Sequence, residues 1–199
     1  MQEAKNRVGE AEWRVFCAVD LPEPARMHLL EYIQRLRRLL PHVQASWSRE
    51  TNLHLTLKFV GEISRELVPT FSDAVSRAVT NEAPFSVVLE GTGVFPQRRD
   101  PRVLWIGISD PEGKLAELHS RLEDESAKAG FSREPRPFHQ HLTVARLRNQ
   151  RFAREVAQTH QQLVFEPQAV TVTELLVIRS ELNSAGSKYT VLSRHPLKK

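Results

Sequence analysis

Two copies of the tripeptide His-Leu-Thr are the strongest candidates for catalytic residues in this chain, because each places a titratable imidazole two residues from a hydroxyl. The first copy begins at His54 in NLHLTLKFVGE, and the second begins 87 positions later, at His141 in FHQHLTVARLR. Random order of a chain of this composition yields well under one copy of such a tripeptide. The repeat therefore needs one explanation that covers both histidines.

Both copies lie in apolar stretches that predict β-strands, in which successive side chains point to opposite faces of the sheet. In the first stretch the alternate leucines and Phe59 are expected on the face that packs on the core. The second stretch shows the same alternation. The side chains predicted on the opposite, open faces are His54, Thr56, Lys58, His141 and Thr143.

Two imidazoles that face each other suit acid–base chemistry at phosphorus. Histidine titrates near neutral pH, so one ring can accept a proton from an attacking water while the other protonates the departing oxygen. The threonine hydroxyls can donate hydrogen bonds to phosphoryl oxygens whose negative charge grows in the transition state. Base-assisted water is a sufficient nucleophile for a strained cyclic ester, so this chemistry requires no metal ion.

Strand-like and helix-like stretches intermingle along the chain, which favours an α+β fold over a doubly wound parallel sheet. Because the repeated motif lies in a comparable strand of each half, we expect one domain (12–195) of two related lobes that share a site. The lobes are expected at about 12–95, with a C-terminal contribution, and about 102–195, after a flexible tail at 1–11. Helices are predicted at 22–40, 64–80, 111–130 and 151–162, and strands at 13–19, 44–48, 52–61, 84–95, 102–108, 140–147, 168–180 and 187–195.

Composition and charge narrow the cellular setting and the class of partner. Hydrophobic residues make up 40% of the chain and charged residues 26%, and no apolar run is long enough to span a membrane. The single cysteine, Cys17, and a charged N-terminus without an apolar signal region indicate a cytoplasmic protein. The net charge of +4 is compatible with an anionic partner. We expect a monomer with no membrane partner.

The tetrapeptides HLTL and HLTV resemble the paired His-x-Thr-x motifs of the 2H phosphoesterases. The surrounding sequence is similar to the branch of RNA 2′,3′-cyclic phosphodiesterases, also described as 2′-5′ RNA ligases. The similar stretches cover nearly the whole chain from Arg14 to Leu192, and they are RVFCAVDLP, NLHLTLKFVGE, GVFPQRRDPRVLWIGI, RPFHQHLTVARLR and LLVIRSELNSAGSKYTVL.

This resemblance implies a bilobal fold of two mainly antiparallel sheets around a central cleft, with helices outside. It implies hydrolysis of an RNA 2′,3′-cyclic phosphate end to a 2′-phosphomonoester, without a metal or other cofactor. Carried over from the family, His54 is the proton donor and His141 the proton acceptor, while Thr56, Thr143 and Arg146 hold the phosphate. By strand parity Arg146 belongs on the face opposite His141, so either the strand bulges after the threonine or the long side chain curls around the strand end.

Other residues are weaker candidates for the site. Lys58, Arg102 and Phe138 are possible substrate contacts, although a surface position explains Lys58 and Arg102 equally well and a core position is favoured for Phe138. Tyr189 and Trp105 are interpreted as core residues. Asp20 is interpreted as a turn or helix-capping acceptor, and not as a catalytic acid.

Three alternative functions stay open. His139 and His141 in HQH have the spacing of two zinc ligands, with a third from His54, His119 or Asp20. Binding of RNA ends without turnover would use stacking aromatics such as Trp47 or Phe138. Within the enzyme class, the two histidines would also serve 2′-5′ RNA ligation, cleavage of 2′-5′ oligoadenylates or opening of ADP-ribose cyclic phosphate.

Overall fold

The computed structural model describes residues 12–97, 100–149, 151–183 and 186–198. The expected flexible tail at 1–11 lies outside the described residues. The helices are α1 (Glu23–Leu39), α2 (Val68–Ala78), α3 (Lys114–Lys128) and α4 (Ala153–Gln162), with 3₁₀ turns η1 (Glu50–Asn52) and η2 (Arg65–Leu67). The strands are β1 (Glu12–Asp20), β2 (Ala45–Trp47), β3 (His54–Ser64), β4 (Phe85–Phe95), β5 (Val103–Ser109), β6 (His141–Leu147), β7 (Gln168–Val172), β8 (Glu174–Asn183) and β9 (Gly186–Pro196).

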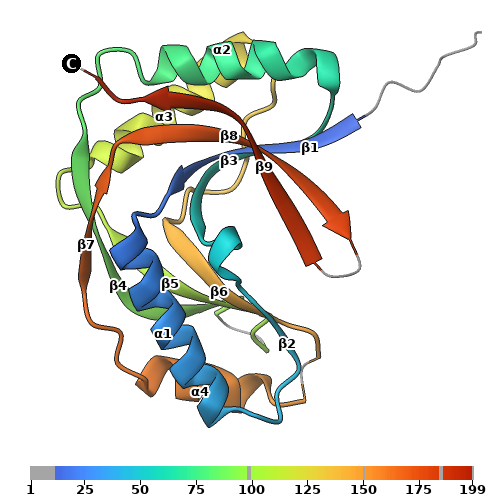
Figure 1. Ribbon diagram of the computed structural model, residues 1–199, viewed down its shortest axis with the longest axis vertical. Helices are drawn as coiled ribbons and strands as arrows, with labels where there is room; N and C mark the ends of the chain where they lie inside the picture. Colours follow the sequence, from blue (N-terminus) through green and yellow to red (C-terminus); the bar gives the residue numbers. More distant parts are fainter. Residues whose placement is uncertain (1–11, 98–99, 150, 184–185, 199) are drawn as a thin grey trace, which may run out of the picture.

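The strands form two antiparallel sheets, which confirms the predicted α+β class. Sheet A has the order β3-β1-β8-β9, and sheet B has the order β2-β6-β5-β4-β7. Every strand pairing within the described residues is antiparallel. Figure 1 shows sheet A in the upper part of the molecule and sheet B below it, with the histidine-bearing strands β3 and β6 beside each other.

The sheets do not divide the chain at about residues 95–102, where the sequence suggested a lobe boundary. Sheet A takes β8 and β9 from the C-terminal end, whereas sheet B takes β2 and β4 from the first half. The helices likewise pair between the two halves of the sequence. Helices α2 and α3 pack together on sheet A, and α1 and α4 pack together beside sheet B. Each lobe, lobe A around sheet A and lobe B around sheet B, is therefore assembled from both halves of the sequence.

The helices bury one apolar face each against the sheets. Leu29, Ile33 and Leu36 of α1 are almost fully buried, as are Leu118 and Leu122 of α3. These positions recur at the three- and four-residue spacing of an amphipathic helix. None of the described helices is both long enough and apolar enough to cross a membrane.

A β-bulge interrupts each motif strand at the same place, the residue after the threonine. In β3, Thr56 pairs with Ala18 and Lys58 pairs with Cys17, so Leu57 is the extra residue. In β6, Thr143 pairs with Trp105 and Ala145 pairs with Leu104, so Val144 is the extra residue. A bulge places two residues opposite one and reverses the side-chain alternation beyond it.

The two bulges change which side chains reach the open face of each sheet. After Leu57 and Val144 the next residues, Lys58 and Ala145, are buried as well. The residues after these are exposed, Phe59 in β3 and Arg146 in β6. The predictions that Phe59 faces the core and Lys58 the open side are therefore wrong. For Arg146 the bulge is the correct choice of the two explanations that the sequence left open.

Lys58 contributes to the interior of lobe A. Its ammonium nitrogen donates to both carboxylate oxygens of Glu123 on α3, at 2.9 Å each, and to the carbonyl of Ser132 at 2.8 Å. The side chain of Lys58 is fully buried and that of Glu123 is 8% exposed. Two opposite charges removed from water in this way are stable only as a pair.

The pair predicts a specific pattern of stability. Lys58→Met keeps the volume but leaves the Glu123 carboxylate buried without its cation, so we expect a loss of about 3–5 kcal/mol in unfolding free energy. The double variant Lys58→Met/Glu123→Leu should recover most of that loss. Urea unfolding followed by circular dichroism measures both values.

The exposed pair Arg77–Glu125, with an N–O distance of 2.8 Å, supplies the control. Arg77→Met should lower the unfolding free energy by less than about 1 kcal/mol, because water screens this pair. Equal effects of Lys58→Met and Arg77→Met would contradict the interpretation of Lys58.

Candidate active site

Each motif histidine is the first residue of its strand, at the end of a sheet ladder. His54 opens β3 and pairs with Asp20 of β1, while His141 opens β6 and pairs with Gly107 of β5. Because β3 and β6 contact each other, the fold brings together the two predicted motifs from different sheets. Each histidine is partly buried, as is the threonine that follows it two residues later.

Backbone hydrogen bonds orient both imidazoles in the same way. Nδ1 of His141 lies 2.6 Å from the carbonyl oxygen of His139, two residues earlier. Since a carbonyl only accepts, Nδ1 carries the proton and Nε2 keeps its lone pair. His54 bonds the backbone of Asn52, also two residues earlier, in a contact that favours the protonated ring. Both lobes therefore fix one ring nitrogen and leave the other for chemistry.

Two aromatic side chains from other strands of the same sheet flank each histidine. Phe16 stacks on the first-motif ring with centroids 4.8 Å apart, and Tyr189 meets it edge-on at 5.1 Å. Phe95 and Trp105 approach the second-motif ring at 5.1 Å and 6.3 Å. Tyr189 and Trp105, interpreted from sequence as core residues, thus line the site.

Burial among these rings lowers the pKa of both histidines, because an apolar environment disfavours the imidazolium. Burial lowers the pKa of His54 to about 4, although the nearby Asp20 carboxylate acts in the opposite direction. Burial also lowers the pKa of His141, assisted by the positive charge of Arg146. Both rings are therefore neutral in the free protein at pH 7.

Three groups that could hold a phosphate lie on the same face as the histidines. Thr56 and Thr143 each follow their histidine by two residues, before the bulge. The bulge then returns Arg146 to this face, where its charge acts on the His141 ring. The equivalent position in β3 is Phe59, which packs on Phe16 at 5.6 Å. Only one lobe supplies a cation at this position.

The three weaker candidates for substrate contact have different surroundings. Lys58 is buried against Glu123, away from the open face. One face of the Phe138 ring is occupied by His119, with the ring centroids 3.9 Å apart and the planes nearly parallel. Arg102 is exposed just before β5, and its guanidinium makes no hydrogen bond or ion pair with another described residue.

Trp47 occupies a core position, and Asp20 is a hydrogen-bond acceptor but not a helix cap. Trp47 packs against the main core, with its strand neighbour Ser46 on the opposite, exposed face. Asp20 accepts hydrogen bonds from the backbone of Leu21 and from Arg26, at 2.9 Å and 2.8 Å, and it does not cap α1. It is an anion next to His54.

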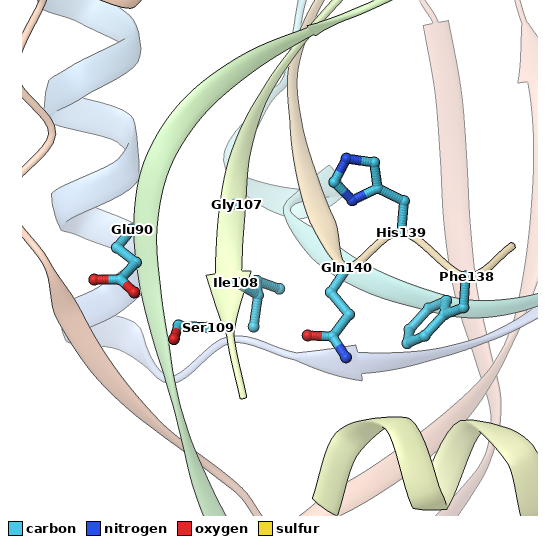
Figure 2. A pocket seen from close by; sticks show the side chains of 7 residues that line it. All are labelled: Glu90, Gly107, Ile108, Ser109, Phe138, His139 and Gln140. Carbon is cyan, nitrogen blue, oxygen red and sulfur yellow. The ribbon is translucent and has the colours of Figure 1, made fainter. Parts of the chain in front are cut away.

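A hollow of about 320 Å³ lies beside the second motif. Its lining comes from the middle of β4 and the end of β5 on one side and from the segment before His141 on the other (Figure 2). Gly107, the strand partner of His141, presents no side chain there. The lining residues are Glu90, Gly107, Ile108, Ser109, Phe138, His139 and Gln140.

A zinc site at HQH lacks a third ligand. The rings of His139 and His141 have centroids 6.0 Å apart, and Nδ1 of His141 is occupied by a carbonyl. Across the part of the chain that the structure describes, no three histidine, cysteine or acidic side chains gather closely enough to hold a metal ion.

Comparison with known proteins places the chain in a family. The model of the 2′-5′ RNA ligase superfamily matches residues 22–183, so the chain belongs to this superfamily. Two relatives named RNA 2′,3′-cyclic phosphodiesterase come from Methanothermobacter thermautotrophicus and Thermotoga maritima. The first is 34% identical, over 89% of this chain and 95% of the relative, and the second is 30% identical, over 90% and 92%.

Solved structures show the same fold. A protein from Thermus thermophilus superposes with a TM-score of 0.75 at 29% identity, covering 92% of this chain and 97% of its own. LigT of Escherichia coli complexed with 3′-AMP gives a TM-score of 0.74 at 27% identity, covering 95% and 100%. The predicted family and fold are thus confirmed.

Proposed function

We propose that this protein hydrolyses 2′,3′-cyclic phosphate ends of RNA to 2′-phosphomonoesters by metal-independent acid–base catalysis. The observation that carries this proposal is the matched pair of His-x-Thr strands, one from each sheet, with equivalent backbone hydrogen bonds on both imidazoles. A protein that only binds RNA does not need two oriented titratable rings. The activity is the one for which the relatives are named.

In the proposed reaction Nε2 of His141 accepts a proton from water as the water oxygen attacks phosphorus. The bond from phosphorus to the 3′ oxygen breaks, and the free ring nitrogen of His54 gives that oxygen a proton. The product keeps the 2′ ester bond, and the two histidines have exchanged protonation states. Thr56, Thr143 and Arg146 donate hydrogen bonds to the phosphoryl oxygens, whose charge grows in the transition state.

The charges around the two rings favour this assignment of roles. Asp20 stabilises a protonated His54, which a donor requires. Arg146 stabilises a neutral His141, which an acceptor requires. Burial opposes the protonation of His54 in the free protein, and the negative charge of a bound cyclic phosphate offsets this by raising the pKa of that ring.

The bound partner is an RNA or nucleotide with a 2′,3′-cyclic phosphate end. We infer a monomeric protein that acts in the cytoplasm, and the single, free cysteine supports the cytoplasmic setting. The same two groups would catalyse the reverse reaction, 2′-5′ joining, because acid and base exchange roles. Hydrolysis dominates wherever water is abundant.

The first test is turnover of an RNA oligomer with a 2′,3′-cyclic phosphate end in excess EDTA, followed by ³¹P NMR. The wild-type protein should yield the 2′-phosphate. His54→Ala and His141→Ala should each lower turnover by about 10²–10⁴, the usual scale for a general acid or base.

The exposed histidine His42, paired with Glu155, provides the matched control. His42→Ala should retain full activity. Activity that EDTA abolishes and zinc restores would contradict the metal-independent mechanism, and a loss below tenfold in either motif variant would contradict its catalytic role.

A sulfur leaving group separates the two roles. A 2′,3′-cyclic phosphorothiolate with sulfur at the 3′ position releases a thiolate, which needs no proton from an acid. With this substrate His54→Ala should regain most of its lost turnover, while His141→Ala should stay inactive because water still needs a base. Rescue of His141→Ala instead would reverse the assignment.

The lowered pKa values predict an acid-shifted pH profile. The ratio kcat/KM reports the free enzyme, in which His54 must be protonated and His141 neutral. Since the pKa of His54 is about 4 and that of His141 lies below its usual value, kcat/KM should peak on the acid side of pH 6.5 and fall toward pH 8.

The constant kcat reports the bound complex, in which the phosphate charge favours imidazolium. Its maximum should therefore lie at higher pH than that of kcat/KM. Steady-state kinetics between pH 4 and 9 measure both profiles, and a kcat/KM that climbs steadily from pH 5 to 8 would contradict the prediction.

A further inference from the structure

The open face of β6 stays polar beyond the phosphate-binding residues, as far as the edge of sheet B. Arg146 pairs directly with Ser46 of β2, and Arg148 follows at the next position of the same face. The Nε of Arg148 donates to Oγ of Ser46 at 3.2 Å, which places its side chain on this face. We refer to Arg148 and Ser46 as the edge pair.

The edge pair is open to solvent and carries an available positive charge. Ser46, Arg146 and Arg148 are exposed, whereas their strand neighbours Ala45 and Trp47 pack on the core. Among the described residues, no carboxylate lies within ion-pair distance of either Arg146 or Arg148. Some other exposed arginines do have such partners, at 3.3 Å for Arg154–Asp100 and 2.6 Å for Arg133–Asp124.

The backbone positions of Arg146 and Arg148, two residues apart, suit contact with two successive phosphates of one RNA strand. Alternate residues of a strand rise by about 6–7 Å, which is close to the separation of neighbouring phosphorus atoms along an RNA chain. Arg146 lies within β6, and Arg148 lies two residues further along the chain, directly after the strand ends at Leu147. A guanidinium can also donate two parallel hydrogen bonds to one phosphate.

We propose that the edge pair is a subsite for the phosphodiester that joins the terminal nucleoside to its 5′ neighbour. Arg148 donates to the non-bridging oxygens of this phosphodiester, and Ser46 holds the guanidinium in place. The enzyme then distinguishes an RNA end from a free nucleoside cyclic phosphate by charge, without reading a base. This inference rests on the proposed hydrolysis of cyclic phosphate ends.

Three substrates test the subsite: a nucleoside 2′,3′-cyclic phosphate, a dinucleotide with the same end, and that dinucleotide with a neutral methylphosphonate linkage. For the wild-type protein, kcat/KM should be about threefold to tenfold higher for the charged than for the neutral dinucleotide. Arg148→Gln should reduce this charged-to-neutral ratio toward one, and Arg148→Lys should keep part of it.

Arg77 on α2 provides the matched control, because Arg77→Gln removes one exposed positive charge from the helix that packs on sheet A, in the other lobe. This variant should keep the wild-type ratio. The salt dependence of kcat/KM for the charged dinucleotide should also weaken in Arg148→Gln but not in Arg77→Gln.

The possible outcomes distinguish failure of the subsite proposal from failure of the proposed hydrolysis of cyclic phosphate ends. A wild-type ratio near one, with the nucleoside cyclic phosphate still hydrolysed, would overturn the subsite and leave the proposed function standing. A ratio that survives in Arg148→Gln would overturn the assignment to the edge pair. Failure to hydrolyse all three substrates would overturn both proposals.

Discussion

The extra residue after each motif threonine is the constraint on which the arrangement of the site depends. Without the bulge at Val144, strict alternation would point Arg146 toward the helices and expose Ala145 instead. Without the bulge at Leu57, the Lys58 ammonium would lie on the open face and could not reach Glu123. The same bulge occurs in both motif strands. In each strand it places the histidine, the threonine and a third side chain on the open face of the sheet.

The two lobes share this bulge but differ in the charges beside their histidines, so the two rings are not equivalent. At the third position lobe B has Arg146, while lobe A has Phe59 packed on Phe16. Beside the first histidine, by contrast, lies the Asp20 carboxylate. A symmetric scaffold with asymmetric charges can hold one proton in a preferred place, because each charge favours a different protonation state of the ring beside it.

The sequence predicted the fold class, most elements and the pairing of the two motifs, because alternation and repetition are local properties of the chain. It could not predict which face Lys58 or Phe59 occupies, since a bulge depends on the partner strand and has no reliable signal in one sequence. Tyr189 and Trp105 were misplaced for a related reason. An aromatic residue in an apolar strand packs equally well in a core or against a histidine, and only the sheet order decides which.

The buried ion pair of Lys58 and Glu123 also connects the first motif strand to the segment before the second motif. Lys58 follows the first histidine by four residues, and it binds the Ser132 carbonyl as well as Glu123. Glu123 in turn accepts a hydrogen bond from the backbone of Glu134 at 3.2 Å. Both contacts hold the segment that leads into His141. Lys58, which the sequence suggested as a substrate contact, therefore connects the strand of the first motif histidine to the segment that precedes the second.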